Sequence, residues 1–277
     1  MLPAYNGGKY IAKSIESVLS QTFADWELIV VDDCSTDKTG EIVLGCPDPR
    51  VHYCRNGVNC TLPRALNRGF RLASGEYLTW TSDDNWYAPN ALERMVSALD
   101  ANPHVDLVAC PFHRVDEDGK IVSERVLEPA FMMQDVNPVG ACFLYRRSAL
   151  GEVGLYNPKF SKAEDAEYWM RMHRFGLKIA MIDEYLYFYR LHSQSLTATN
   201  PPGFVGGLYE SLRQTHITWW MRFKVRVYRR AVKYSKGHTF FRLLGMILPP
   251  KLVGGMVKRY EDRFRVGRFS EIESRRE

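Results

Sequence analysis

The sequence predicts an α/β fold, with a mostly parallel sheet flanked by helices and a basic helical appendage at the C-terminal end. Helical and strand patterns alternate along residues 7–83, which is typical of repeated βαβ units. The length of 277 residues fits one large domain with an appendage, because single cores stop growing at roughly 250–300 residues. Residues 201–277 hold 17 Lys and Arg against 6 Asp and Glu, whereas residues 1–200 hold 20 against 26. We therefore expect one domain over residues 1–200 and a basic amphipathic tail over 201–277.

The individual elements follow from hydrophobic periodicity. Residues 9–19 place Ile11, Ile15 and Val18 on one helical stripe, and residues 28–31 form a short apolar run that ends at two acids. Such a run is typical of a buried parallel strand that ends where its loop begins. Further helices are predicted at about 37–45, 65–73, 89–101 and 164–175, and further strands at about 51–53, 77–80, 105–110 and 139–145. A hairpin turn is predicted at Asp118-Gly119.

Composition excludes several classes of protein. Apolar residues make up 45% and charged residues 25% of the chain, which excludes disordered and fibrous proteins. No stretch reaches the roughly 18–20 apolar residues of a membrane span, and the N-terminal residues lack the pattern of a signal peptide. The six cysteines include no C-x-x-C pair, so neither a zinc cage nor a redox dithiol is expected. We expect a cytoplasmic protein with reduced thiols.

Acidic residues follow two of the predicted strands. Asp32-Asp33 comes after one strand and Asp83-Asp84 after another. Ligands of parallel sheets bind beyond the carboxyl ends of the strands, so these acids are expected to face one crevice. A third pair, Glu164-Asp165, lies in the first turn of a predicted helix, where the helix dipole alone would favour acids by about 0.3–1 kcal/mol.

These residues, in this order, resemble the family 2 glycosyltransferases of the GT-A fold. The resemblance covers residues 3–197 and rests on Pro3-Ala4-Tyr5-Asn6, residues 17–22, residues 27–37, Ala73-Ser74-Gly75-Glu76-Tyr77, Ser82-Asp83-Asp84-Asn85 and Glu164-Asp165. It implies a Rossmann-like nucleotide-binding sheet and an inverting transfer of sugar from a nucleotide donor.

The resemblance implies that the Pro-x-Tyr motif and the first acidic pair bind the base of the nucleotide. Asp32 or Asp33 would read a pyrimidine, and Tyr5 of the Pro3-x-Tyr5 motif would lie against it. A carboxylate can accept the imide N–H of uracil or thymine, and a phenol ring offers a stacking face. An ordinary loop tyrosine is the alternative for Tyr5.

The second acidic cluster resembles the family's metal and ribose motif, Asp-x-Asp-Asp. Thr81 stands where the first Asp often is, so Asp83 and Asp84 must carry the motif. We assign Asp84, or failing that Asp83, to Mg²⁺ or Mn²⁺ and the other to the ribose, because a hard cation needs few protein oxygens when a diphosphate supplies the rest. A polar turn without a ligand is the alternative.

By the same resemblance Asp165 is the general base, with Glu164 beside it, and two adjacent acids raise each other's pKa. Arg190 and His192 resemble a segment that closes over the donor, where a cation could meet the diphosphate. Arg64, at the start of a helix, could also reach the nucleotide. Structural or surface roles are equally open for Arg190 and His192.

Both ends of the chain carry further expectations. In the family a central strand of about five residues precedes the Pro-x-Tyr motif, whereas Met1 and Leu2 alone precede Pro3 here. We expect an incomplete strand that is completed upstream or by another segment. The tail has aromatic residues beside a basic face, which suits either an anionic membrane surface or packing on the domain. No motif accompanies the charge that would indicate nucleic-acid binding.

We therefore expect a metal-dependent inverting glycosyltransferase. Its donor would be a UDP- or dTDP-sugar, and its acceptor a hydroxyl in cell-surface polysaccharide or lipid-linked glycan synthesis. It would be cytoplasmic or peripheral on the inner face of the cell membrane. The alternatives are a nucleotide-sugar hydrolase, a nucleotidyltransferase or a non-catalytic membrane-docked binding protein.

Overall fold

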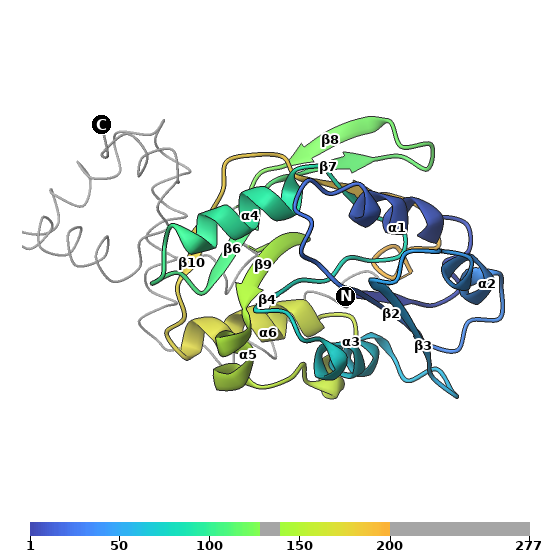
Figure 1. Cartoon of the computed structure of the whole chain (residues 1–277), viewed down its shortest axis with the longest axis horizontal. Helices are drawn as coiled ribbons and strands as arrows, with labels where there is room; N and C mark the ends of the chain where they lie inside the picture. Colours follow the sequence, from blue (N-terminus) through green and yellow to red (C-terminus); the bar gives the residue numbers. More distant parts are fainter. Residues whose placement is uncertain (128–138, 200–277) are drawn as a thin grey trace, which may run out of the picture.

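Helices cover both faces of a central β-structure in the computed structural model, which describes residues 1–127 and 139–199 (Figure 1). The strands are β1 (Leu2–Ala4), β2 (Leu28–Asp32), β3 (Val51–Arg55), β4 (Tyr77–Leu78), β5 (Trp86–Tyr87), β6 (Leu107–Cys110), β7 (Phe112–Val115), β8 (Ile121–Arg125), β9 (Cys142–Arg146), β10 (Ile179–Met181) and β11 (Tyr187–Arg190). The helices are α1 (Ile11–Leu19), α2 (Thr39–Leu44), α3 (Leu62–Leu72), α4 (Ala91–Asp100), α5 (Arg147–Val153) and α6 (Glu164–Arg174), with a 3₁₀ turn, η2, at Pro158–Phe160.

The N-terminal half of the domain is the parallel sheet that the sequence predicts. Its strand order is β1-β2-β3, and both pairs are parallel. All five residues of β2 are buried, as expected for an apolar run covered on both faces. The helices between these strands make this part of the chain a βαβ arrangement.

Strand β1 lies beside β2, in the position that we expected to be incomplete. Leu2 to Ala4 pair with Val30 to Asp32, so the edge that we expected to stay open is covered along the second half of β2. Beyond it, the Met1 amine donates to the Thr79 carbonyl at 3.1 Å, and the Thr81 N–H donates to the Met1 carbonyl at 3.0 Å. Burial lowers the pKa of the Met1 amine to about 5. Backbone pairing therefore continues from β1 to the residues that follow β4.

The other strands form two mixed sheets, with orders β10-β6-β9-β4 and β5-β11-β7-β8. Strand β6 is parallel to β10 and β7 is parallel to β11, but β9, β5 and β8 pair antiparallel with their neighbours. The prediction of a mostly parallel sheet is thus correct for β1 to β3 and incomplete beyond them. One reason is the hairpin β7–β8, which is antiparallel by construction and turns at the predicted Asp118-Gly119, where Gly119 has φ 89°.

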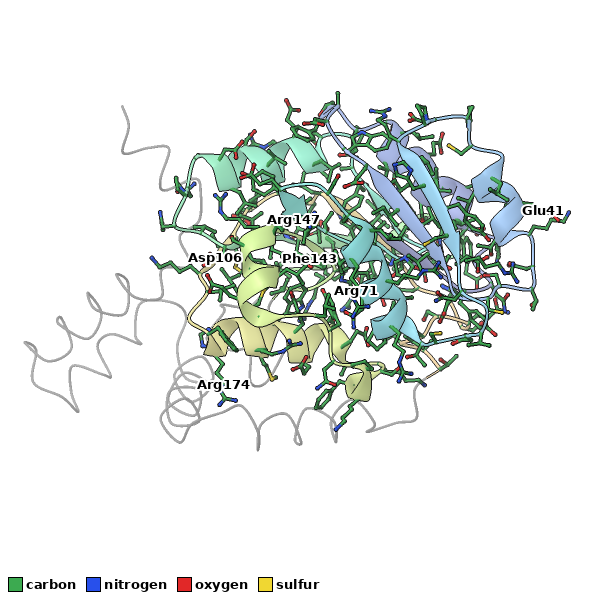
Figure 2. The ribbon with its side chains drawn as sticks, turned by 60° about the horizontal axis from the view of Figure 1, so that its bottom comes forward. Glu41, Arg71, Asp106, Phe143, Arg147 and Arg174 are labelled. Atoms are coloured by element: carbon green, nitrogen blue, oxygen red, sulfur yellow. The ribbon has the colours of Figure 1, made fainter. Side chains whose placement is uncertain are left out.

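An aromatic cluster joins α6 to the strands. Phe143 of β9 lies inside the molecule, whereas Glu41 and Arg174 project outward (Figure 2). The Phe143 ring meets the Trp169 ring edge-on at 4.6 Å between centroids, and Tyr156 stacks on Tyr168 at 4.1 Å. These buried rings fix the position of the helix that begins with Glu164 and Asp165.

In the described residues, no helix has both the length and the apolar character needed to cross a membrane. The expected tail, residues 201–277, lies outside the described residues.

Candidate active site

Three loops meet beyond the carboxyl ends of the strands. The Asn6 N–H donates to Ser35 Oγ at 2.9 Å, and Asn6 Oδ1 accepts the Thr36 N–H at 2.8 Å, which ties the loop after β1 to the loop after β2. The Tyr5 N–H donates to Asp83 Oδ2 at 3.1 Å, which ties the same loop to the residues after β4. The structure thus brings the first motif together with both acidic clusters.

Asp32 and Asp33 differ in how many of their carboxylate oxygens accept hydrogen bonds within the protein. Asp32 is fully buried; its Oδ1 accepts the Ser35 N–H at 2.7 Å, and its Oδ2 accepts the Tyr53 hydroxyl at 2.6 Å and contacts Arg55 at 3.5 Å. These contacts hold the loop in place and leave Asp32 little capacity for a ligand.

Asp33 keeps one carboxylate oxygen available. Its Oδ1 accepts Asn56 Nδ2 at 2.7 Å and the Cys60 N–H at 2.8 Å, whereas Oδ2 has no hydrogen bond to any described residue. The adjacent Cys34 adopts φ 70°, a left-handed conformation that favours glycine. Of the two candidates, Asp33 is the better placed to accept a hydrogen bond from a base.

Pro3 is buried and Tyr5 is exposed. Pro3 is buried within β1, while the Tyr5 side chain projects outward and the residue is 52% exposed. An exposed ring beside two carboxylate loops can stack on a planar ligand.

Asp83 and Asp84 have different surroundings. Desolvation, together with the neighbouring charge of Asp84, raises the pKa of Asp83 to about 7. The backbone of Gly7 approaches so closely that a Cβ there would overlap the Asp83 carboxylate. Asp84 Oδ2 lies 2.9 Å from His192 Nε2, and Asp84 Oδ1 is buried without a hydrogen-bond partner among the described residues.

A buried carboxylate oxygen without a partner fits a hard divalent cation. No group of three or more His, Cys, Asp or Glu side chains in the described residues could hold a metal by itself. A cation at Asp84 would therefore depend on ligand oxygens for most of its coordination. Thr81 cannot contribute in this conformation, because it is buried and its hydroxyl lies 2.7 Å from the Tyr187 hydroxyl.

Glu164 and Asp165 begin α6. Burial, and then the charge of Asp165, raise the pKa of Glu164 to about 8. Glu164 Oε2 accepts the Lys162 N–H at 2.8 Å, and Asp165 Oδ1 accepts the Ala166 N–H at 2.6 Å. Asp165 is partly exposed and Glu164 is 4% exposed, so Asp165 is the acid of this pair that a ligand can reach.

Tyr189 feels the charges of both acidic regions, and the sequence did not predict it as a site residue. Burial raises the pKa of Tyr189, and the carboxylates of Asp84 and Asp165 both raise it further. Both acids are therefore close enough to Tyr189 to act on it electrostatically. The Tyr189 hydroxyl lies 3.1 Å from Thr197 Oγ1. Nothing in strand periodicity distinguishes Tyr189 from a packing residue.

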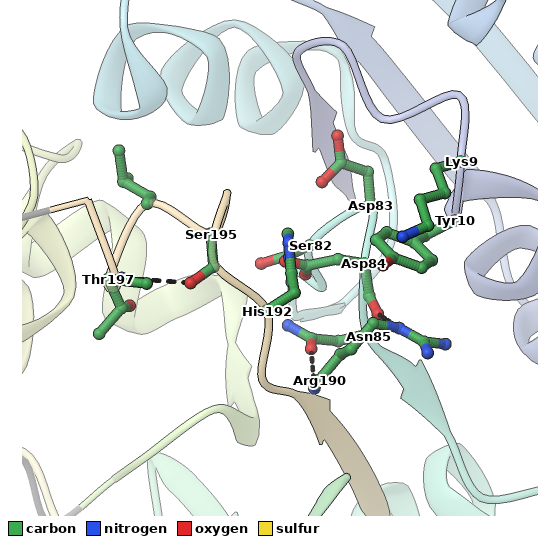
Figure 3. Close-up of polar contacts among 12 residues, drawn as sticks. Lys9, Tyr10, Ser82, Asp83, Asp84, Asn85, Arg190, His192, Ser195 and Thr197 are labelled. Atoms are coloured by element: carbon green, nitrogen blue, oxygen red, sulfur yellow. Dashed lines mark hydrogen bonds and ion pairs between the residues drawn. The ribbon is translucent and has the colours of Figure 1, made fainter. Parts of the chain in front are cut away.

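The remaining candidates occupy three different environments. His192 packs edge-on against Tyr10 at 5.2 Å and contacts Asp84 (Figure 3). Arg190 is 6% exposed and its side chain donates to backbone carbonyls. Arg64 is exposed, and its side chain makes no hydrogen bond or ion pair with another described residue.

The fold and the order of these motifs define a glycosyltransferase of the GT-A type. Residues 1–154 match the family model "Glycosyl transferase family 2", and the chain belongs to that family.

Two sequence relatives illustrate the range of the family. An uncharacterized glycosyltransferase of Rickettsia typhi is 27% identical over 210 residues, which are 72% of this chain and 65% of the relative. The putative colanic acid biosynthesis glycosyl transferase WcaA of Escherichia coli is 27% identical over 186 residues, covering 62% of this chain and 64% of WcaA. The chain thus spans about two thirds of the length of these relatives.

Two solved structures share the fold. Staphylococcus aureus TarS 1–349 in complex with UDP-GlcNAc has a TM-score of 0.62 and 20% identity, covering 72% of this chain and 60% of the TarS 1–349 chain. The mannosyltransferase PcManGT of Pyrobaculum calidifontis, in complex with GDP-Man and Mn²⁺, has a TM-score of 0.58 and 18% identity over 94% of this chain and 83% of PcManGT.

Proposed function

We propose that this protein is an inverting glycosyltransferase that moves a sugar from a UDP- or dTDP-linked donor to a hydroxyl acceptor. The acceptor would belong to cell-surface polysaccharide or lipid-linked glycan synthesis. The UDP-GlcNAc bound by TarS and the assignment of WcaA to colanic acid biosynthesis support this choice. The observation that carries it is the meeting of Tyr5, Asp83 and Asp84. The Tyr5 N–H donates to Asp83, and a buried oxygen of Asp84 has no hydrogen-bond partner among the described residues.

The base would bind between Tyr5 and Asp33. The exposed Tyr5 ring supplies a stacking face, and Asp33 Oδ2 supplies an acceptor for the imide N–H of uracil or thymine. Guanine also offers ring N–H donors, and PcManGT binds GDP-Man, so GDP-sugars belong in the test. Asp33→Asn should weaken UDP binding about tenfold or more, because an amide donor could then face the imide donor. Its matched control is Cys34→Ser on the same loop.

Asp83 and Asp84 would hold the ribose and a divalent cation. Asp84 Oδ1 is available for Mg²⁺ or Mn²⁺, and Asp83 would accept a hydrogen bond from a ribose hydroxyl. When bound, such a cation stabilises negative charge on a nucleoside diphosphate leaving group. His192 already contacts Asp84 and would face the diphosphate side of the site.

Asp165 would take the proton from the acceptor hydroxyl as that oxygen forms its bond to the anomeric carbon. The carbon–oxygen bond to the diphosphate breaks on the opposite face of the sugar, which inverts the configuration. Glu164, with its raised pKa, would stay protonated at neutral pH and leave a single negative charge on the pair.

A calorimetric panel of UDP-, dTDP- and GDP-sugars, with and without Mn²⁺, tests the donor. A second assay measures nucleoside diphosphate release with and without an oligosaccharide acceptor. A transferase releases more diphosphate when acceptor is added, a hydrolase releases it regardless, a nucleotidyltransferase releases pyrophosphate from a nucleoside triphosphate, and a binding protein releases none. Binding of no nucleotide-sugar in the panel would contradict the proposed function.

A further inference from the structure

Arg190 joins three segments of the site that are far apart in the sequence. Its Nε donates to the Asp84 carbonyl at 3.1 Å, and its Nη1 donates to the Asp116 carbonyl at 3.4 Å and to the Glu117 carbonyl. Its own N–H donates to Asn85 Oδ1 at 2.7 Å (Figure 3). One side chain thus links the end of β11, the loop that carries Asp84 and the turn of the β7–β8 hairpin.

The Arg190 guanidinium also makes cation–π contacts with two aromatic rings. It lies 4.4 Å from the centroid of the Tyr10 ring and 4.8 Å from that of Trp86. Among the described residues no carboxylate lies within ion-pair distance of Arg190, so its charge is balanced by carbonyl dipoles and ring faces. A buried cation of this kind is costly unless its donors are satisfied, which indicates that the geometry is strongly specified.

The turn at the other end of this link is closed by hydrogen bonds and is exposed. Asp116 Oδ1 accepts the N–H groups of Asp118 at 3.1 Å and Lys120 at 2.9 Å, and Glu117 Oε2 accepts Lys9 Nζ at 2.8 Å. Glu117, Asp118 and Lys120 are exposed. A change in this turn can therefore reach Asp84 through carbonyls that share one guanidinium.

We propose that Arg190 is a positioning residue that couples the turn at residues 116–119 to the conformation of the Asp84 loop. The conformation of the turn then helps to set how tightly the site holds a metal–nucleotide complex. This inference rests on the proposed function for its purpose, although the mechanical link can be tested without any ligand. In this proposal Arg190 acts by binding the carbonyls of the two loops, and it does not contact the diphosphate directly.

Lysine is the informative substitution at this position. It keeps the charge, but its single ammonium cannot reproduce the planar fork that reaches three carbonyls. We expect Arg190→Lys to speed amide hydrogen exchange at least about tenfold in both residues 82–87 and residues 116–120. Arg94→Lys, in a surface pair with Glu184, is the matched control and should change neither segment.

The coupling is measured with a double-mutant cycle. Asp116→Ala removes the acceptor that shapes the turn, and lies outside the proposed binding groups. We expect Asp116→Ala to weaken Mn²⁺-dependent UDP affinity about threefold to tenfold in the parent protein, and to cause no further loss in Arg190→Lys.

The outcomes of these experiments test the coupling and its purpose separately. Unchanged exchange at 82–87 in Arg190→Lys, or additive losses in the cycle, would contradict the coupling. If Arg190→Lys does not fold, Asp116→Ala alone decides, because exchange that rises in the turn and stays unchanged at 82–87 also contradicts it. A parent protein that binds no Mn²⁺–UDP, with exchange responding as expected, would contradict the proposed function and the purpose of the link, but leave the link itself supported.

Discussion

Glu164→Gln tests whether the acid beside the proposed base is neutral. The residue is 4% exposed, and burial with the charge of Asp165 raises its pKa from 4.5 to about 8. A group whose pKa is higher in the folded than in the unfolded state stabilises the fold fully below its unfolded pKa. That stability is lost as the pH rises through the folded pKa. The ionisation of Glu164 should therefore make the parent protein progressively less stable as the pH rises from about 4.5 to about 8.

The magnitude follows from linkage. Each pKa unit corresponds to about 1.4 kcal/mol, so a rise from 4.5 to about 8 lowers the free energy of unfolding by up to about 5 kcal/mol above pH 8. Glutamine has nearly the same shape and no proton to lose. We expect Glu164→Gln to stay within about 1 kcal/mol of the parent at pH 5 and to exceed it by at least about 2 kcal/mol at pH 9.

Urea denaturation from pH 5 to pH 9 measures this difference, and Glu167→Gln in the same helix is the matched control. Glu167 pairs with Arg171 at 2.7 Å, and the Arg171 guanidinium also donates to the Val153 and Leu155 carbonyls. Glu167→Gln removes the charge of that pair and should destabilise by about 1.5–3 kcal/mol at every pH from 5 to 9. Transfer by Glu164→Gln at pH 7 should stay within about tenfold of the parent, since the parent residue is already neutral there. If Glu164→Gln and the parent lose stability equally as the pH rises, Glu164 is ionised in the folded protein and the reasoning is wrong.

The other predictions concern the base, the metal and the tail. Asp165→Asn should bind donor almost normally and lose transfer by roughly 10²–10⁴-fold, whereas an equal loss of donor affinity would indicate a structural cap. Asp84→Ala should abolish Mn²⁺-dependent donor binding in calorimetry, and unchanged affinity would refute the metal assignment. Reversing the charges of Arg226, Arg229 and Arg230 should move the protein from the pellet of anionic liposomes to the supernatant, with soluble-acceptor activity unchanged. A parent protein that does not pellet at low salt would end the membrane hypothesis.

The strands that sequence predicted well are those with their own apolar run. Residues 28–31 are apolar throughout, and β2 lies at Leu28–Asp32. Strand β1 has three residues, too few for any periodicity, and exists because Leu2 to Ala4 meet Val30 to Asp32. The antiparallel strands β5 and β9 likewise depend on distant partners, so their direction could not be derived from local pattern.

The candidate site shows the same division between local and distant information. The acids could be found from their positions after strands and at the start of a helix. The choice between Asp32 and Asp33 could not, because Asp32 is occupied by Tyr53 and Arg55, which β3 brings alongside in register. Tyr189 was missed for a similar reason, since the electrostatic effect of Asp84 and Asp165 on it exists only in the folded chain.

Uncharged side chains connect the Asp83-Asp84 loop to α6, which carries Glu164 and Asp165. Trp80, just before the Asp83-Asp84 loop, donates through its Nε1 to the Tyr156 hydroxyl at 3.1 Å, and Asn67 makes two hydrogen bonds to the Tyr156 backbone at 2.8 Å. Tyr156 in turn stacks on Tyr168 of α6, the helix that begins at Glu164. Carboxylates that face one ligand repel one another, so direct contacts among them cannot fix their positions. A buried aromatic and amide junction can, because its packing and hydrogen bonds do not depend on the charge of the ligand.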